Sequence, residues 1–160
     1  EAWLVVRYKI NEQLRFERNL HNQNIEFYIP RIFTNTLKGS NKKSEVLFPG
    51  YGFIRLANTN LQALGNTLGL ISIIRFGDQF AMAEDSMITQ FKELEYSPEI
   101  QPIRAKRLAK DDMALVTSGP FKGYMSKILT TSAKDRATIL ISLLGSERTL
   151  TLSAANLQKQ

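Results

Sequence analysis

A basic, proline-bearing stretch in the second half of the chain limits how the 160 residues can fold. Residues 97–110, SPEIQPIRAKRLAK, contain two prolines, four basic residues and no aromatic residue. That composition is typical of an extended linker rather than of a packed element. We therefore predict two domains, residues 1–96 and residues 111–160, separated by a linker over residues 97–110. A second domain of this size is near the lower limit for independent stability.

The first domain is expected to alternate strands with helices. Runs rich in Val, Ile and aromatic residues predict strands, and apolar residues at helical spacing predict helices. The expected strands cover residues 3–8, 25–33, 46–56 and 69–77, and the expected helices cover residues 11–22, 59–68 and 84–96. Pro30 should bend the second strand or place it at an edge, because proline donates no ladder hydrogen bond. This order predicts an α/β sandwich with an antiparallel sheet, which is an α+β fold.

Particular segments of this domain are expected in the core or in a loop. The strand over residues 69–77 is expected to be buried, and residues 37–43, LKGSNKK, are expected to form a hairpin tip. The helical side chains expected in the core are Leu14, Phe16 and Leu20 in the first helix and Met87, Ile88, Phe91 and Leu94 in the last.

The second domain is consistent with two folds. MALV, YMSKILT, RATILISLL and RTLTL are four short strand candidates separated by turn-forming residues, which predicts a small β-barrel. Residues 132–150 can also form a helix that starts at Ser132 and carries four apolar side chains on one face. Those side chains are Ile139, Leu140, Leu143 and Leu144. The β-branched residues of TILIS favour a strand, whereas Ala, Arg, Leu and Lys tolerate a helix, so both forms stay open.

The composition excludes several classes of catalytic and metal site. The chain has no cysteine and a single histidine, His21. Disulfides, thiolate zinc sites, a Cys nucleophile and a His-rich metal site are therefore excluded. His21 lies among polar residues with no nucleophile motif nearby, so we expect it on the surface. The segment GPFKG has neither the length nor the Lys-Ser/Thr ending of a phosphate-binding loop.

The charge is distributed unevenly along the chain. Residues 1–95 carry 11 Lys/Arg and 10 Asp/Glu, whereas residues 96–160 carry 10 and 5, so most of the net charge of +6 lies in the second part. Such an excess favours phosphate-bearing or acidic partners. No apolar run approaches the ~18 residues that a membrane span needs, and no secretory signal is visible. We expect a cytoplasmic protein.

The stretch VLFPGYGFIRL, residues 46–56, places three aromatic side chains within six residues beside a Pro-Gly turn signal. They are Phe48, Tyr51 and Phe53. Aromatic side chains on a rigid sheet are typical anchors for a docking partner. Strand alternation can equally turn Phe48 and Phe53 into the core, so both interpretations stay open. Tyr51 has an apolar body and a polar tip, which suits an interface.

Several motifs, taken together and in this order, resemble the NusG family of transcription elongation factors over nearly the whole chain. The motifs are WLVV at residues 3–6, LFPGY at residues 47–51 with Phe53, RFG at residues 75–77, VTSGPFKG at residues 116–123, LLGSERTLTL and AANLQ. The resemblance implies a first domain that binds the clamp helices of RNA polymerase and the non-template DNA strand, and suppresses pausing. It implies that the second is a KOW barrel that recruits Rho or a small-subunit ribosomal protein. It implies no enzyme activity and no cofactor or metal, and we expect a monomer.

The resemblance also assigns roles to individual residues. Positions that line the polymerase-binding groove are matched by Phe48, Tyr51, Phe53 and Phe76, and Arg7 stands where relatives often have an aromatic residue. Positions that contact DNA are matched by Lys9 and Arg15, with Arg18 one turn further along the same helix. The KOW position that contacts partners is matched by Phe121. The basic hairpin tip, with Lys38, Lys42 and Lys43, is expected to follow upstream DNA by phosphate attraction.

Within the family the chain is most similar to the specialised RfaH branch, through residues 12–32, EQLRFERNLHNQNIEFYIPRI. In RfaH-like proteins the C-terminal domain folds as an α-helical hairpin that hides the groove, and it refolds as a β-barrel after release. Glu45 and Arg136 match an interdomain ion pair that holds the closed form. Pro120 opposes a helix at its position, because an interior proline costs ~3 kcal/mol. Autoinhibition by fold switching is therefore a hypothesis at this point.

Two other classes of function fit parts of the sequence. KOW-type barrels also occur in ribosomal proteins, so an RNA-binding module is the alternative, with Lys122, Lys127 and Lys134 on its RNA face. An enzyme would have to use Glu84 and Asp85. Adjacent residues on a helix point in different directions, and acidic residues are common at helix starts, so we expect a helix N-terminus there instead.

Overall fold

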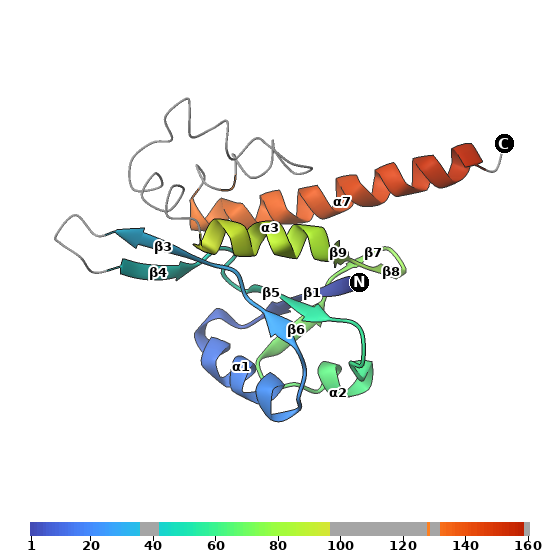
Figure 1. Ribbon diagram of the computed structural model, residues 1–160. Coiled ribbons are helices and arrows are strands. Elements are labelled where there is room, and N and C mark those ends of the chain that lie inside the picture. The colour runs from blue at the N-terminus through green and yellow to red at the C-terminus, as the bar shows by residue number, and fades with distance from the viewer. Residues whose placement is uncertain (36–41, 97–127, 129–131, 159–160) are drawn as a thin grey trace.

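The computed structural model describes residues 1–35, 42–96, 128 and 132–158 of the chain (Figure 1). The predicted linker, Pro120, Phe121, the strand candidate MALV and all of YMSKILT except residue 128 lie outside the described residues. The predicted domain boundaries therefore stay predictions.

An antiparallel sheet of five strands forms the centre of the first domain. Its central strand, β1 (Ala2–Tyr8), pairs with β5 (Tyr51–Arg55) on one side and with β6 (Leu70–Ile73) and β9 (Met82–Glu84) on the other. The short strand β2 (Phe27–Tyr28) extends the sheet beyond β5. Strand β1 is rich in valine and aromatic residues, which suit a pleated, buried position. The predicted antiparallel sheet and the α+β class are confirmed.

Helices cover both faces of this sheet. The 3-10 turn η1 (Ile10–Glu12) leads into α1 (Gln13–Asn22), which lies with α2 (Leu61–Gly65) against one face. Helix α3 (Asp85–Tyr96) lies against the other face (Figure 1). Asn60 caps α2, because its side-chain oxygen accepts hydrogen bonds from two backbone N–H groups of the first turn. The three predicted helices are confirmed, with ends that differ by a few residues.

Alternation along β1 divides the core into two clusters, because successive side chains of a strand face opposite sides of the sheet. Leu4, Val6 and Tyr8 are buried on the side of α1 and α2. Trp3 and Val5 are buried on the side of α3, where the predicted core residues of that helix join them. Those residues are Met87, Ile88, Phe91 and Leu94.

Two short hairpins extend from the sheet. Strand β3 (Arg31–Asn35) pairs with β4 (Lys42–Val46), and β7 (Arg75–Phe76) pairs with β8 (Gln79–Phe80). Pro30 separates β2 from β3, so the predicted bend in the second strand is confirmed.

Three predictions about this domain are wrong. Leu14 is 75% exposed, because it lies two residues and therefore about 200° around the helix from the buried Phe16. Ile71, in the strand predicted to be buried, is 48% exposed. It belongs to an edge strand and lies at a register shift against β1, so it has no direct partner there. Lys42 and Lys43 lie in β4 rather than in the hairpin tip, because they pair with β3.

The described residues after 131 form one long helix, α7 (Ala133–Gln158). The strand predictions for RATILISLL and RTLTL are therefore wrong in this conformation, and the helical alternative is observed. Leu140, Leu143 and Leu144 recur at helical spacing and are buried together, which outweighs the strand preference of the β-branched residues. Figure 1 shows α7 next to α3 on the same side of the sheet, with its C-terminal half continuing beyond the sheet.

Candidate functional site: an aromatic face covered by the C-terminal helix

The aromatic side chains before and within β5 lie on the side of the sheet that carries α3. Tyr51 and Phe53 share this side because they are two residues apart in a strand, opposite Arg7 and Val5 of β1. Phe48 lies in the turn before the strand, which a hydrogen bond of 3.0 Å from the Tyr51 N–H to the Phe48 carbonyl holds. These three side chains and Phe76 are called the aromatic face.

Phe48 and Phe53 are fully buried, whereas Tyr51 and Phe76 are partly buried and pack against the same cluster. Phe91 of α3 lies between the two buried rings. Its centroid is 5.3 Å from that of Phe48, edge to face, and 5.8 Å from that of Phe53. Both distances are in the range of favourable aromatic pairs. The sequence predicted Phe91 as a core residue of α3 and gave no signal for its place behind the aromatic face.

Helix α7 covers the aromatic face. Leu140, Leu143 and Leu144 are buried in the same cluster as Phe48 and Phe53, and Ile139 packs against it. Their spacing puts them on one side of the helix. Further along α7, a Cβ added at Gly145 would lie 3.8 Å from two ring carbons of Phe76. The side of α7 that faces the sheet is thus apolar over about two turns, from Ile139 to Gly145.

Arg136 joins α7 to the strand before the aromatic face. Its side chain is fully buried. Nη2 donates to Glu45 Oε1 at 3.1 Å and to the Val46 carbonyl at 3.3 Å, and Nε donates to the Leu47 carbonyl. A buried cation needs such partners, because taking a charge out of water is costly. The structure thus brings together Glu45 and Arg136, the two residues matched to an ion pair, and adds two backbone acceptors that the sequence did not indicate.

The basic residues matched to DNA contacts lie together at the end of β1 and the start of α1. Lys9, Arg15 and Arg18 are all exposed. Glu12 lies between the first two, 3.4 Å from Lys9 Nζ and 3.1 Å from Arg15 Nη1. Exposed pairs of this kind add little to stability, so these cations are held loosely and can exchange partners. Arg7 is exposed on the side of the aromatic face, opposite Tyr51.

Two of the remaining candidate residues are exposed on helices, and three lie outside the described residues. Lys134 is exposed on α7, His21 is exposed on α1, and Lys38, Lys122 and Lys127 lie outside the described residues.

The acidic pair considered for catalysis has another place in the fold. Glu84 ends β9, and Asp85 begins α3. Asp85 Oδ1 accepts a hydrogen bond of 2.6 Å from the Trp3 indole, and this bond lowers the pKa of the Asp85 carboxyl group. Within residues 1–35, 42–96 and 132–158, no group of three His, Cys, Asp or Glu side chains could hold a metal ion. None of the helices described there is long and apolar enough to cross a membrane.

Comparison with protein families agrees with this geometry. Residues 1–92 match the family model described as NusG, transcription termination factor nusG. The match spans more than half of the chain. The chain belongs to the NusG family. Members of the family are transcription termination and elongation factors that generally bind RNA polymerase, and they act as regulators rather than as enzymes. A search of curated proteins gave no match.

The family match covers the sheet, α1, α2, the first two thirds of α3 and all four residues of the aromatic face. It ends at residue 92, so α7 lies outside it.

Proposed function

We propose that this NusG-family protein binds the clamp helices of RNA polymerase through its aromatic face and thereby suppresses pausing and termination. The observation that carries the proposal is that an apolar helix, α7, already occupies this face. A surface that buries the leucines of one helix can bury the apolar side of another. Phe48 and Phe53 are buried in the present conformation, so a partner that uses them has to displace α7.

We propose further that the exposed cations at the start of α1 contact the non-template DNA strand. Lys9 and Arg15 both pair with Glu12, and Arg18 follows Arg15 by about one turn of α1. Such contacts would position DNA without reading its bases. Their affinity should fall steeply with salt concentration.

The position of α7 over the aromatic face supports the proposal that this chain is an RfaH-like, autoinhibited member of the family. In this proposal Arg136 and the leucines of α7 hide the aromatic face until the partner or DNA displaces them. The released residues 111–160 then refold as a KOW barrel. Through Phe121 the barrel recruits a small-subunit ribosomal protein or Rho. The protein acts as a monomer in the cytoplasm.

The proposal is tested by polymerase binding in a variant whose α7 is displaced. Leu140→Asp together with Leu144→Asp puts two charges into the buried side of α7 and leaves the aromatic face intact; this double substitution is called the released variant. We expect the released variant to bind core RNA polymerase at least about tenfold more tightly than the wild-type chain, because burying two carboxylates should cost more than 1.4 kcal/mol. Ser142→Asp, at an exposed position of the same helix, is the matched control and should change nothing.

Adding Tyr51→Ala to the released variant identifies the surface that binds. We expect this substitution to weaken binding about tenfold or more, because a truncated aromatic anchor typically costs 2 kcal/mol or more. Unchanged binding in the triple variant would show that polymerase uses another surface. Binding of naked RNA with a steep salt dependence, and none of polymerase, would favour the RNA-binding alternative.

A further inference from the structure

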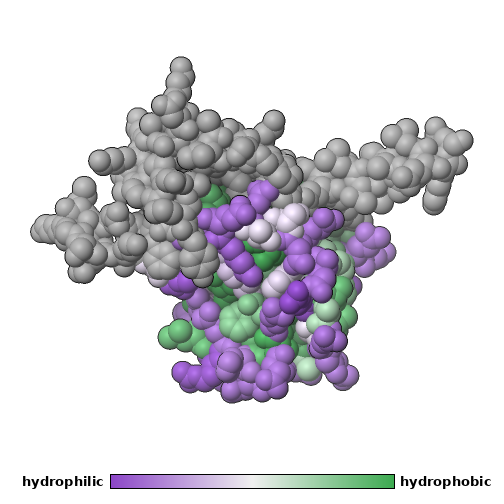
Figure 2. Space-filling view, in the orientation of Figure 1, coloured by the Kyte–Doolittle hydropathy of each residue, from purple (hydrophilic) through white to green (hydrophobic). Residues whose placement is uncertain are grey.

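An apolar strip beside α7 stays exposed while that helix covers the aromatic face. The strip consists of Ile10, Leu14, Pro49 and Tyr51 and is called the open strip. Ile10 is 64% exposed and Leu14 is 75% exposed, whereas Pro49 and Tyr51 are half-buried. Ile10 begins η1, and Leu14 lies in the first turn of α1. In Figure 2, apolar patches interrupt the hydrophilic surface over the part of the domain that carries α1.

The open strip is continuous with the aromatic face. A Cβ added at Gly50 would lie 3.2 Å from Ile10 Cγ1, so Ile10 lies over the turn that leads into β5. The Tyr8 N–H donates to the Gly50 carbonyl at 2.8 Å and fixes the end of β1 to the same turn. Tyr51 belongs to both surfaces, because its ring also packs against the cluster that contains Phe53. A partner on the aromatic face can therefore reach Ile10 without crossing polar surface.

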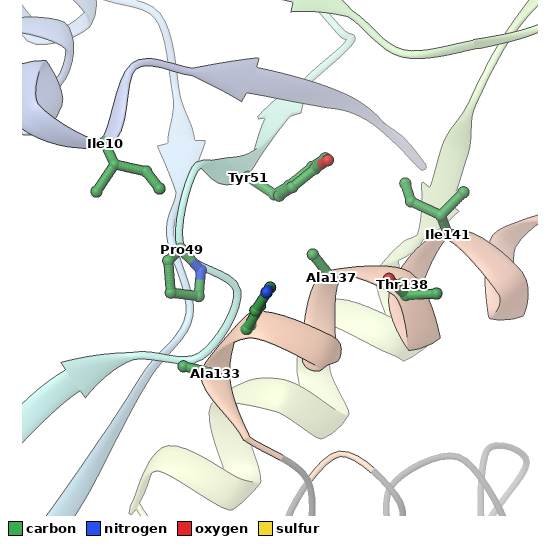
Figure 3. A pocket seen from close by; sticks show the side chains of 8 residues that line it. Ile10, Pro49, Tyr51, Ala133, Ala137, Thr138 and Ile141 are labelled. Carbon is green, nitrogen blue, oxygen red and sulfur yellow. The ribbon is translucent and has the colours of Figure 1, made fainter.

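A cavity of about 660 Å³ lies between three residues of the open strip, Ile10, Pro49 and Tyr51, and α7. Figure 3 shows Ile10, Pro49 and Tyr51 on one side of it, with the α7 side chains opposite. The α7 residues that line it are Ala133, Lys134, Ala137, Thr138 and Ile141. Every fourth residue of α7 in this set lines the cavity, namely Ala133, Ala137 and Ile141. They form a second side of the helix, next to the buried leucine side. Atoms that line a gap lose dispersion contacts, so this edge of α7 is packed less tightly than its buried leucine side.

Basic side chains surround the open strip. Arg7 lies beside Tyr51 in the sheet, Arg18 lies one turn beyond Leu14, and Lys134 lies on the α7 side of the cavity. The acidic neighbour Glu12 is already paired with Lys9, at 3.4 Å. A surface with an apolar centre and a basic rim fits a helix whose apolar stripe is flanked by acidic residues.

We infer that the open strip is where the partner helix makes its first contact, before α7 leaves. The inference rests on the proposed function, since the partner is the helical polymerase surface assigned above to the aromatic face. Apolar side chains of that helix bind Ile10, Leu14 and Tyr51 and enter the cavity, where α7 makes few contacts. Binding then spreads along β5 as α7 is displaced. The covered chain, in which α7 still lies on the aromatic face, can therefore begin to bind the partner helix through the open strip.

The test measures association rate constants with immobilised core RNA polymerase, using the full chain throughout. Ile10→Ser with Leu14→Ser removes the exposed apolar side chains and should not disturb the core. Met82→Ser is the matched control, because Met82 is 40% exposed, pairs with Leu4 in the sheet and does not line the cavity. Each substitution is also made in the released variant. Both backgrounds are measured at two ionic strengths.

We expect the Ile10/Leu14 double substitution to lower the association rate constant of the covered chain about tenfold, as for the loss of two partly buried apolar contacts. In the released variant the aromatic face is already accessible, so the same substitution should lower the rate constant less than about twofold. Met82→Ser should have no effect in either background. The rate constant of the covered chain should also fall with rising salt, because the rim is basic.

Two outcomes overturn the inference while leaving the proposed function intact. An equal loss in both backgrounds would make the open strip an ordinary part of the interface, with no special role before α7 leaves. Full binding rates in the covered double variant would remove the strip from the interface altogether. If neither the wild-type chain nor the released variant binds polymerase, the proposed function fails and the inference fails with it.

Discussion

A single side chain, Arg136, connects α7 to the β4 segment that leads into the aromatic face. The guanidinium group is fully buried and donates to one carboxylate and two backbone carbonyls. The Glu45 side chain, by contrast, is 44% exposed. The two members of the pair should therefore contribute unequally, because an exposed carboxylate is already stabilised by water.

Glu45→Gln is expected to weaken α7 docking only slightly, by about 1 kcal/mol or less, since both backbone acceptors remain. Arg136→Ala is expected to weaken docking by roughly 3 kcal/mol, since it leaves the Val46 and Leu47 carbonyls without this donor. Hydrogen exchange of the amides of α7 measures the difference. Equal protection of the α7 amides in Glu45→Gln and Arg136→Ala would contradict the unequal contributions of Glu45 and Arg136.

Tyr8 offers a second prediction for a single residue. Its ring is buried and stacked on Phe16, with centroids 5.1 Å apart, and its hydroxyl makes no hydrogen bond of good geometry among the described residues, although the Gly50 backbone is near enough to interact with it. Burial raises the pKa of this hydroxyl. Tyr8→Phe keeps the ring and removes a desolvated polar atom, so the free energy of unfolding should stay the same or rise by up to about 1 kcal/mol. Chemical denaturation measures this free energy. A decrease of about 1 kcal/mol or more in Tyr8→Phe would contradict the prediction, because it would show that the Tyr8 hydroxyl makes a stabilising hydrogen bond.

Asp85 should make stability depend on pH. Its pKa is lowered in the folded protein, chiefly by the Trp3 indole, so its stabilising contribution is present above its unfolded pKa and is lost as pH falls through the folded pKa. Asp85→Asn should therefore lower the melting temperature slightly at pH 7. The difference from wild type should disappear under acid conditions. A difference that is constant with pH would assign the effect to packing rather than to charge.

At the scale of elements, the sequence predicted what is set by local pattern. The strand β1, the helices α1 and α3 and the bend at Pro30 follow from period, propensity and proline chemistry. The exposure of Leu14 was missed because three apolar residues in one helix were all assigned to the core, although only Phe16 and Leu20 are one turn apart. The exposure of Ile71 was missed because it results from a register shift, and a register shift depends on the partner strand β1 as well as on the local sequence.

Helix α7 shows where local pattern is insufficient. Residues 136–144 carry both β-branched residues and leucines at helical spacing, so their form is decided by what they pack against. Likewise, the aromatic stretch indicated Phe48, Tyr51 and Phe53, but not that Phe91 lies behind them. The cavity beside α7 could not be predicted at all, because it joins residues 10, 49 and 51 to residues 133–141.

This dependence on context gives a prediction for α7 as an element. Residues 108–160 alone lack the aromatic face, so the leucines of α7 lose their burial site. We expect the isolated segment to lose most of its helical circular dichroism signal and to gain a β signal, as the alternative barrel predicts. The full chain should keep the helical signal. A helical spectrum in the isolated segment would contradict refolding into a barrel.

At the scale of the whole molecule, the proposed function makes α7 and the polymerase helices compete for one surface. The aromatic face either buries α7 or binds the proposed polymerase helices, and the two states exclude each other. The apparent affinity of the covered chain is then reduced by the fraction of molecules in which the face is free. The open strip lets binding begin within the covered state, and the basic residues around it favour an acidic partner.

The most direct test of this account compares the full chain with residues 1–98 for binding to core RNA polymerase in a pull-down titration. If α7 masks the aromatic face, the fragment binds and the full chain binds at least about tenfold more weakly, a difference of 1.4 kcal/mol or more. Equal binding by both proteins would contradict the account, because α7 would then cover a surface that polymerase does not need.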